Sequence, residues 1–169
     1  APVDILSEEH LKNTGTSDLY KALTILAPSF TFPLEPAGAF AAQIPAGASL
    51  RGLASDQVLV LIKRRHTGAI FTRQNLANGR GAASVDLSLI PLNAIKRVEI
   101  LRDGAAAQYG SDAIAGVINI ILKDDDDHGA ASYRFGQFSS GEGEQHKLSL
   151  WKGFSLPNDG SLTFAFEYG

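Results

Sequence analysis

Two strand-like runs joined by a tight, small-residue turn lie between Lys96 and Lys123, and this stretch constrains the fold most. In the first run, Val98 and Ile100 alternate with charged residues, which is typical of a half-buried strand. The second run, Gly116 to Leu122, is almost continuously apolar and β-branched. We therefore expect a strand buried on both faces, in which the polar Asn119 needs hydrogen-bond partners.

The residues between the two runs predict a strand, a short helix and a second strand in succession. Asp103-Gly104 ends the first run, because glycine adopts positive φ at the lowest cost. Ala105 to Gln108 is long enough for one helical turn, which Gly110 should end, and Ser111-Asp112 opens a second turn.

Short helices are predicted ahead of this stretch. Ser7 is followed by two glutamates, so it can cap a helix that runs to about Lys12. Ser17 or Asp18 can cap a second helix, which Pro28 should end. Further along, Gln57 to Ile62 is almost wholly apolar and predicts a central strand.

The residues from Pro33 to Ala48 form a Pro/Gly/Ala-rich loop with almost no charge, and Phe40 is its one aromatic residue after Pro33. Loops of this length are usually functional or disordered. Two interpretations remain open: a mobile loop in which the Phe40 ring is exposed, and a loop whose tip contacts a ligand.

A second long loop, Lys63 to Ser84, is strongly basic. Five basic residues and no acid lie between Asp56 and Asp86, although the chain as a whole has a net charge of −3. A solvated surface, complementarity to an acidic wall and attraction for an anionic ligand could each explain this charge. The basic residues are Lys63, Arg64, Arg65, Arg73 and Arg80.

After Lys123 the pattern changes. Four consecutive acids, Asp124 to Asp127, predict a linker. The segments that follow alternate with period two, which favours either strands of a transmembrane β-barrel or a soluble antiparallel meander. The alternating apolar positions are Tyr133, Phe135, Leu148, Leu150, Leu162, Phe164, Phe166 and Tyr168.

Composition excludes several kinds of chemistry. The chain of 169 residues has no cysteine, which excludes disulfides and thiolate sites, and its mild acidity argues against a nucleic-acid partner. The four histidines lack metal-ligand spacing, and no catalytic or nucleotide-binding motif is present, so we expect neither enzyme activity nor a cofactor. No run approaches the roughly 18 apolar residues of a membrane helix, and no signal peptide opens the chain. We expect a fragment of an exported protein.

An ordered set of motifs resembles the plug domain of TonB-dependent outer-membrane receptors. One departure is that Lys63 follows Ile62 directly, where the family usually has Asn-Gly or Asp-Gly, so we expect a shortened turn. The matching motifs are Leu50-Arg51-Gly52, Val58 to Ile62, Glu99, Arg102, Tyr109-Gly110, Ala115 to Ile120 and Lys123.

The resemblance implies an α+β plug over residues 1–123, with a small mixed four-stranded sheet, short helices and long loops. Residues 124–128 would be an acidic linker, and residues 129–169 the first antiparallel strands of a truncated transmembrane barrel. The complete receptor would be a plugged barrel of about 22 strands in the outer membrane of a Gram-negative bacterium. The fragment itself is expected to be soluble.

The implied function is gating of the active uptake of a scarce nutrient, commonly a ferric siderophore. The implied partners are the rest of the barrel, the ligand, and TonB, which would bind a box upstream of Ala1. The alternative is a soluble periplasmic binding or assembly module whose meander is self-contained.

The resemblance also implies site residues. Arg51 and Arg102 would pair with glutamates of the barrel, with Glu99 as an orienting partner. If residues 129–169 are ordered in isolation, we expect a second copy of the chain to cover Leu162 and its neighbours. The candidate ligand contacts are Phe40, Arg65, His66, Arg73, Gln74, Asn75 and Arg80.

Overall fold

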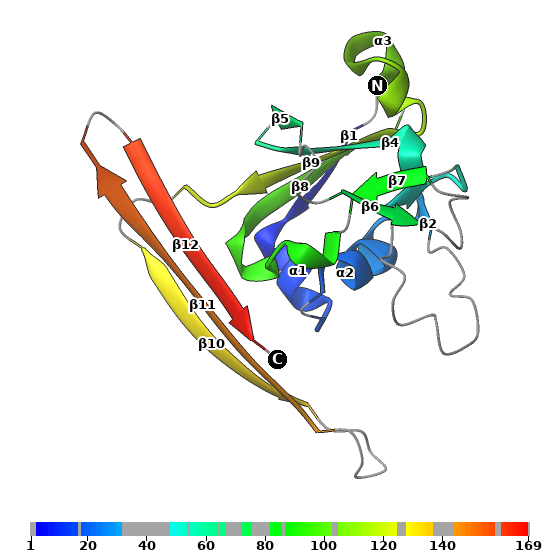
Figure 1. Cartoon of the computed structure of the whole chain (residues 1–169). Helices are drawn as coiled ribbons and strands as arrows, with labels where there is room; N and C mark the ends of the chain where they lie inside the picture. Colours follow the sequence, from blue (N-terminus) through cyan, green and yellow to red (C-terminus); the bar gives the residue numbers. More distant parts are fainter. Residues whose placement is uncertain are drawn as a thin grey trace. The chain divides into compact units, whose positions relative to one another are not determined.

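The structure, a computed structural model, divides into two compact units (Figure 1). Unit 1 comprises Ala1–Leu92 and Lys96–Leu122, and unit 2 comprises Asn93–Ile95 and Lys123–Gly169. The residues that the structure describes are 3–16, 18–31, 48–53, 55–63, 65–66, 72–75, 82–85, 87–102, 105–124, 128–136, 144–157 and 160–168.

A mixed sheet with the strand order β1-β8-β9-β4-β5 forms the centre of unit 1. β1 pairs antiparallel with β8, β4 pairs parallel with β9, and the short β5 pairs antiparallel with β4. The four longer strands confirm the predicted mixed sheet, and β5 adds a fifth at the edge. The strands are β1 (Val3–Ser7), β4 (Val58–Ile62), β5 (Arg65–His66), β8 (Ile95–Leu101) and β9 (Gly116–Leu122).

β9 is buried because it lies between β8 and β4 and is covered on both faces. Residues from Gly116 to Ile120 are buried, and Ile118 and Ile120 have no exposed surface. This confirms the expectation of a central strand buried on both faces. One small cluster on the sheet contains Leu59, Ala113 and Val117.

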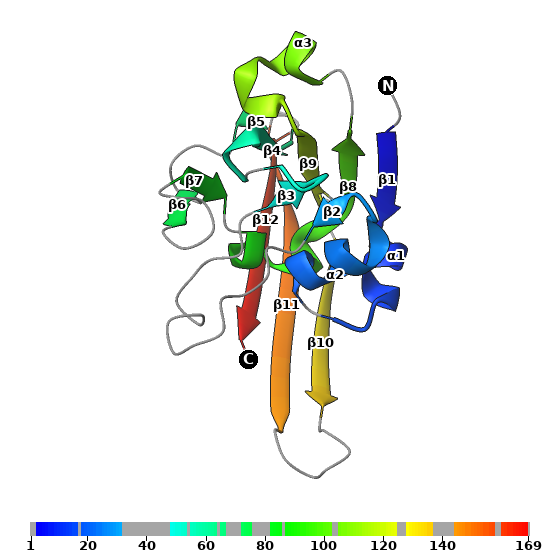
Figure 2. The same ribbon diagram turned by 90° about the vertical axis from the view of Figure 1, so that its right-hand side faces the viewer.

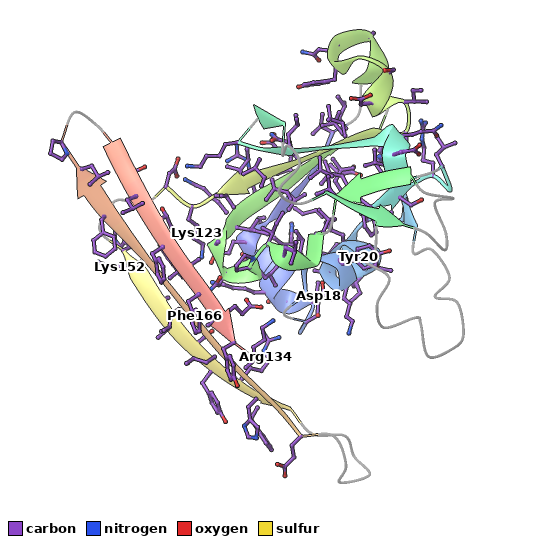
Figure 3. All side chains as sticks on the ribbon, viewed as in Figure 1. Asp18, Tyr20, Lys123, Arg134, Lys152 and Phe166 are labelled. Carbon is purple, nitrogen blue, oxygen red and sulfur yellow. The ribbon has the colours of Figure 1, made fainter. Side chains whose placement is uncertain are left out.

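Helices α1 (Glu8–Asn13) and α2 (Leu19–Leu26) begin as the sequence predicts. The Ser7 side chain accepts a hydrogen bond from the backbone N–H of His10, and the Asp18 carboxylate accepts one from Tyr20 (Figure 3). Each cap satisfies a backbone donor that the first helical turn leaves free. The helices contribute three leucines to the core that are at most 1% exposed, namely Leu11, Leu19 and Leu23.

The chain from β8 to β9 passes through two short helices beyond the strand ends (Figure 2). These are α3 (Ala105–Tyr109) and the 3-10 helix η6 (Ser111–Ala113). Gly110 separates them with φ of 89°, a left-handed conformation that glycine adopts at low cost. The predicted helical turn and second turn are therefore confirmed.

The basic segment expected to be one long loop contains further strands. β6 (Thr72–Asn75) pairs antiparallel with β7 (Ala82–Val85). Before this segment, Phe30–Thr31 (β2) pairs with Ser49–Leu50 (β3). Thr72–Asn75 is polar throughout, so it lacks the hydrophobic alternation that marks a strand in sequence.

The tight turn after β4 differs from the expectation. Ile62 pairs with Arg65, so two residues connect the strands, which is the ordinary length of a tight hairpin. The prediction of a shortened turn was therefore wrong. The departure from the family is in residue type, because Lys63 has φ of 49° where Asn or Gly is usual.

Three more 3-10 turns of three residues each lie in the described part of the chain. Their bounds are η2 (Ser55–Gln57), η4 (Leu87–Leu89) and η5 (Leu92–Ala94). The last of these directly precedes β8.

Unit 2 contains an antiparallel meander of three long strands, as the period-two pattern predicts (Figure 2). They are β10 (Gly129–Gly136), β11 (Gln145–Leu156) and β12 (Gly160–Tyr168). Tyr133 lies opposite Leu148, which in turn lies opposite Tyr168, so these side chains share one face of the sheet.

The two faces of this sheet differ in polarity. On one face the apolar side chains are exposed, by 54% for Leu162 and 63% for Phe164. On the other, Lys147 forms an ion pair with Glu167, and the hydroxyls of Ser132 and Ser149 are 2.7 Å apart. The apolar face also has polar contacts, since the hydroxyl of Tyr133 lies 2.6 Å from Nδ1 of His146. None of the described helices has the length and apolar character needed to cross a membrane.

Candidate functional site

Glu99 occupies a small polar network between β8 and β9. Its Oε2 accepts a hydrogen bond from Nδ2 of Asn119 at 2.9 Å, and its Oε1 is 2.8 Å from Nε of Arg97. The Glu99 side chain is 20% exposed, so the ion pair with Arg97 is partly shielded from solvent. The predicted need of Asn119 for a hydrogen-bond partner is met by this carboxylate.

Arg102 follows β8 and binds the first strand of the chain. Its terminal guanidinium nitrogen lies 2.6 Å from Oδ1 of Asp4 in β1. The two side chains are 34% and 30% exposed, so solvent weakens their attraction. Nε of Arg102 is buried and has no hydrogen-bond partner among the described residues.

Arg51 lies in a tight turn after β3. Its φ is 55°, and the next residue, Gly52, has φ of 73°. Its backbone N–H donates to the carbonyl of Ser29 at 2.8 Å, and its guanidinium is 3.4 Å from the carbonyl of Ile114. The residue is exposed, so its side chain is accessible on the surface of unit 1.

These contacts place the three predicted lock residues in separate environments. Glu99 and Arg102 are three positions apart, and successive strand residues point to opposite faces. Glu99 accordingly binds Arg97 and Asn119, whereas Arg102 binds Asp4. Sequence reasoning missed Asp4, whose pairing with Arg102 depends on β1 lying beside β8. Contact of Arg51, Glu99 and Arg102 with a barrel stays a prediction.

The predicted ligand contacts are only partly within the described residues. Phe40 and Arg80 lie outside them. Arg65 and His66 form β5, whereas Arg73, Gln74 and Asn75 belong to β6, which pairs with β7. Their role in ligand binding stays a prediction.

The chemistry available at these positions is reversible binding. The described groups are ion pairs and hydrogen bonds between charged side chains and amides, which can break and reform without covalent change. Within the described ranges, no three His, Asp or Glu side chains come together as a metal site.

Comparison with known proteins identifies the family. Residues 1–117 match the family model described as TonB-dependent Receptor Plug Domain. The vitamin B12 transporter BtuB of Vibrio cholerae is 39% identical over 119 residues, which are 69% of this chain and 17% of that protein. The iron-regulated outer membrane virulence protein of Vibrio cholerae is 42% identical over 78 residues, which are 46% of this chain and 11% of that protein.

Solved structures share the fold. A variant of the ferric enterobactin receptor PfeA from Pseudomonas aeruginosa, in complex with enterobactin, superposes with a TM-score of 0.66 at 22% identity, covering 92% of this chain and 23% of the receptor. The unliganded ferric citrate transporter FecA gives 0.70 at 17% identity, covering 99% and 25%. The chain thus spans about a quarter or less of each relative. Because the family model covers more than half of the chain, the chain belongs to the family of TonB-dependent receptor plug domains.

Proposed function

We propose that this chain is the plug, or gate, of an outer-membrane receptor that takes up a scarce nutrient with energy supplied through TonB. Residues 1–123 form the plug, residues 124–128 a linker, and residues 129–169 the first strands of the surrounding barrel. The plug holds the pore closed through reversible polar contacts and performs no catalysis.

The main support for this proposal is that the two faces of the unit 2 sheet differ in polarity, and that this sheet follows a plug-family match in the same chain. A barrel strand faces lipid with apolar side chains and faces the lumen with polar ones. The unit 2 sheet has this arrangement, because Phe164 is 63% exposed on one face while Lys147 and Glu167 pair on the other.

The rival function is a soluble binding or assembly module. It requires the meander to bury its own apolar face. In the described part of unit 2, Leu162, Phe166 and Tyr168 remain exposed on that face. These exposures favour the barrel interpretation over a self-contained soluble sheet.

For the ligand, we propose a ferric siderophore. Such ligands are often anionic, which suits the five basic residues between Asp56 and Asp86. PfeA, whose fold is similar, is a ferric enterobactin receptor. The BtuB relative is named as a vitamin B12 transporter, which makes cobalamin the competing ligand.

The function is tested with the full-length receptor in cells that lack their own siderophore and cobalamin receptors. We expect TonB-dependent uptake of a labelled ferric siderophore from a panel, with no uptake when TonB is absent. Uptake of cyanocobalamin alone would overturn the ligand class and leave the receptor function intact. Absence of uptake for every ligand would overturn both.

The basic segment is tested by substituting Arg73→Ala together with Arg80→Ala in the full-length receptor. We expect the dissociation constant for the ferric siderophore to rise about tenfold, which corresponds to about 1.4 kcal/mol of lost attraction. Lys21→Ala is the matched control, because Lys21 is an exposed cation of α2 outside the basic segment. An unaltered dissociation constant in the double variant would contradict the assignment.

The closed state is tested by Arg51→Ala with Arg102→Ala. We expect cells to become more sensitive to large antibiotics, because two cations that hold the plug are lost. Asp4→Asn is the control, since it removes the negative charge that pairs with Arg102 within the chain and leaves both arginines in place. Unchanged antibiotic sensitivity and unchanged transport would overturn the lock, and the same effect from Asp4→Asn alone would assign it to the β1–β8 pair.

A further inference from the structure

Unit 2 includes a segment that is distant from its strands in sequence. Asn93–Ile95 belongs to the same compact unit as β10, β11 and β12, although the plug-family match continues to residue 117. The contacts that join this segment to the rest of unit 2 involve Asn93, Ala94 and Lys123.

Asn93 ties two neighbouring strands together. Its Nδ2 donates to the carbonyl oxygen of Leu150 at 3.0 Å and approaches that of Phe166 at 3.4 Å. Leu150 in β11 and Phe166 in β12 lie directly opposite each other in the sheet. A single side-chain amide thus bridges the two strands. If Asn93 moved away, two backbone carbonyl oxygens would lose this donor.

Lys123 is held through its backbone and its side chain. Its N–H donates to the carbonyl of Ala94 at 2.9 Å, and its carbonyl accepts from the hydroxyl of Thr163 in β12 at 3.1 Å. Its ammonium lies 4.3 Å from the centroid of the Trp151 ring, where a cation is attracted to the ring face (Figure 3). The residue is 3% exposed, so these interactions are shielded from water.

These contacts fix the points at which the chain enters β8 and leaves β9. Ala94 immediately precedes β8, and Lys123 immediately follows β9. We propose that Asn93, Ala94 and Lys123 form a base clamp that stays bonded to β11 and β12 while unit 1 rearranges to open the pore. This inference rests on the proposed function, because only a receptor plug has a pore to open.

β1 provides the contrast within unit 1. It lies at the edge of its sheet and pairs with β8 alone. Val3 and Ile5 are 49% and 59% exposed, and the Asp4–Arg102 ion pair is also partly exposed. A pull from the N-terminal end would therefore meet weakly held contacts first and reach the shielded base clamp last.

The clamp is tested by a covalent lock in the full-length receptor. Lys123→Cys and Thr163→Cys are joined by a short bis-methanethiosulfonate, which forms a reducible disulfide with each cysteine, and uptake of the transported ligand is measured before joining, after joining and after reduction. We expect uptake to stay within about twofold, because a contact that persists in both states does not oppose opening. A fall of about tenfold or more that reduction reverses would overturn the clamp.

A matched lock shows that such joins can block opening. Val3→Cys and Leu101→Cys face each other across β1 and β8. We expect this lock to reduce uptake strongly and reversibly. Equal uptake with both locks would show that β1 also stays bonded to β8 during opening. The base clamp would then not be distinguished from the rest of the plug by its persistence.

A measurement independent of transport uses site-resolved hydrogen exchange in the receptor. Leu23→Ala weakens the core of unit 1, so we expect faster exchange at Val60 and Ile118 and an unchanged rate at Lys123. Acceleration of the Lys123 amide by the same factor as those of unit 1 would overturn the clamp.

The contribution of Asn93 is tested in the same way. Asn93→Ala should accelerate exchange at Lys123 by about tenfold, because the clamp loses a bridge to two strands. Ser132→Ala is the matched control, since its hydroxyl pairs with Ser149 and lies outside the clamp. An unaltered rate in Asn93→Ala would remove that residue from the clamp. If no ligand is taken up, the proposed function fails, and the hydrogen-exchange rate of the Lys123 amide then tests the base clamp by itself.

Discussion

The central sheet of unit 1 buries its apolar side chains, whereas the sheet of unit 2 exposes similar ones. In β9, Ile118 and Ile120 have no exposed surface, whereas Leu148 and Leu150 in β11 are each 39% exposed. Both strands have neighbouring strands on either side, so the difference comes from the faces, which are covered by packed side chains in β9 and are partly exposed in β11. Burial in this chain is thus decided by what packs against a strand, in addition to the strand's own residues.

The polar groups of the two sheets show the same reversal. In unit 1 the buried Asn119 donates a hydrogen bond to Glu99, whereas in unit 2 Lys147 and Glu167 form an ion pair on the face opposite the exposed apolar side chains. The first sheet resembles the core of a soluble domain. The second has the polarity expected of a strand that separates a polar interior from lipid.

The largest effect expected in this comparison is at Gly116. Its φ is 143°, and a Cβ there would lie 2.6 Å from the carbonyl oxygen of Leu101 and 2.9 Å from Leu50. We expect Gly116→Ala to lower the free energy of unfolding of unit 1 by about 4 kcal/mol, from backbone strain and overpacking together.

Urea unfolding of the chain measures the Gly116→Ala effect. Gly136→Ala in β10 is the control, because a Cβ at Gly136 meets nothing within 4 Å. A loss below about 1 kcal/mol for Gly116→Ala would mean that the neighbouring strand can move away.

The next effect compares matched leucines. Leu23→Ala should lower the free energy of unfolding by about 3 kcal/mol, because Leu23 is fully buried in unit 1. Leu162→Ala should change it by about 0.5 kcal/mol or less in water, because Leu162 is 54% exposed. Urea midpoints of the two variants give both values, and equal losses would show that the apolar face of unit 2 is covered.

A smaller effect is expected at Asn119. Asn119→Ala removes the donor to Glu99 and should lower the free energy of unfolding by about 1.5 kcal/mol. Ser132→Ala on the exposed sheet should cost about 0.5 kcal/mol or less, because water can replace the lost contact. Thermal unfolding of both variants tests the difference, which would vanish if Glu99 readily found another donor.

The smallest effect is a gain at Lys63. Lys63→Asn should raise the free energy of unfolding by about 0.5 kcal/mol, because asparagine tolerates a φ of 49° better than lysine does. Lys96→Asn in β8 is the control and should be slightly destabilising, since asparagine is disfavoured in strands. A loss of stability in Lys63→Asn would show that the lysine side chain contributes more than the backbone strain costs.

Sequence reasoning predicted the elements whose signals are local. The caps at Ser7 and Asp18, the strands β8 and β9, and the turn at Gly110 follow from side chains that act within a few residues. The strands of unit 2 were likewise predicted from their period of two. The short strands β6 and β7 were missed, because neither has the apolar alternation that marks a strand in sequence.

The candidate site depended on both levels. The motif resemblance identified Arg51, Glu99 and Arg102, but it did not provide the contacts with Asp4 and Arg97. These contacts depend on which strands are neighbours and on which face each side chain lies. The period of two in a sequence predicts on which face of a sheet a side chain lies. It does not predict which strand lies next to it.

The central strands, the turns around Gly110 and the family of the chain could be predicted from the residues alone, because they depend on local preference and ordered motifs. The pairing of Arg102 with Asp4, the contact of Asn93 with strands more than fifty residues away, and the burial of one sheet but not the other emerged only from the folded structure. The physical reason is that long-range contacts require distant segments to meet, and their energy depends on the packed neighbours rather than on either segment alone.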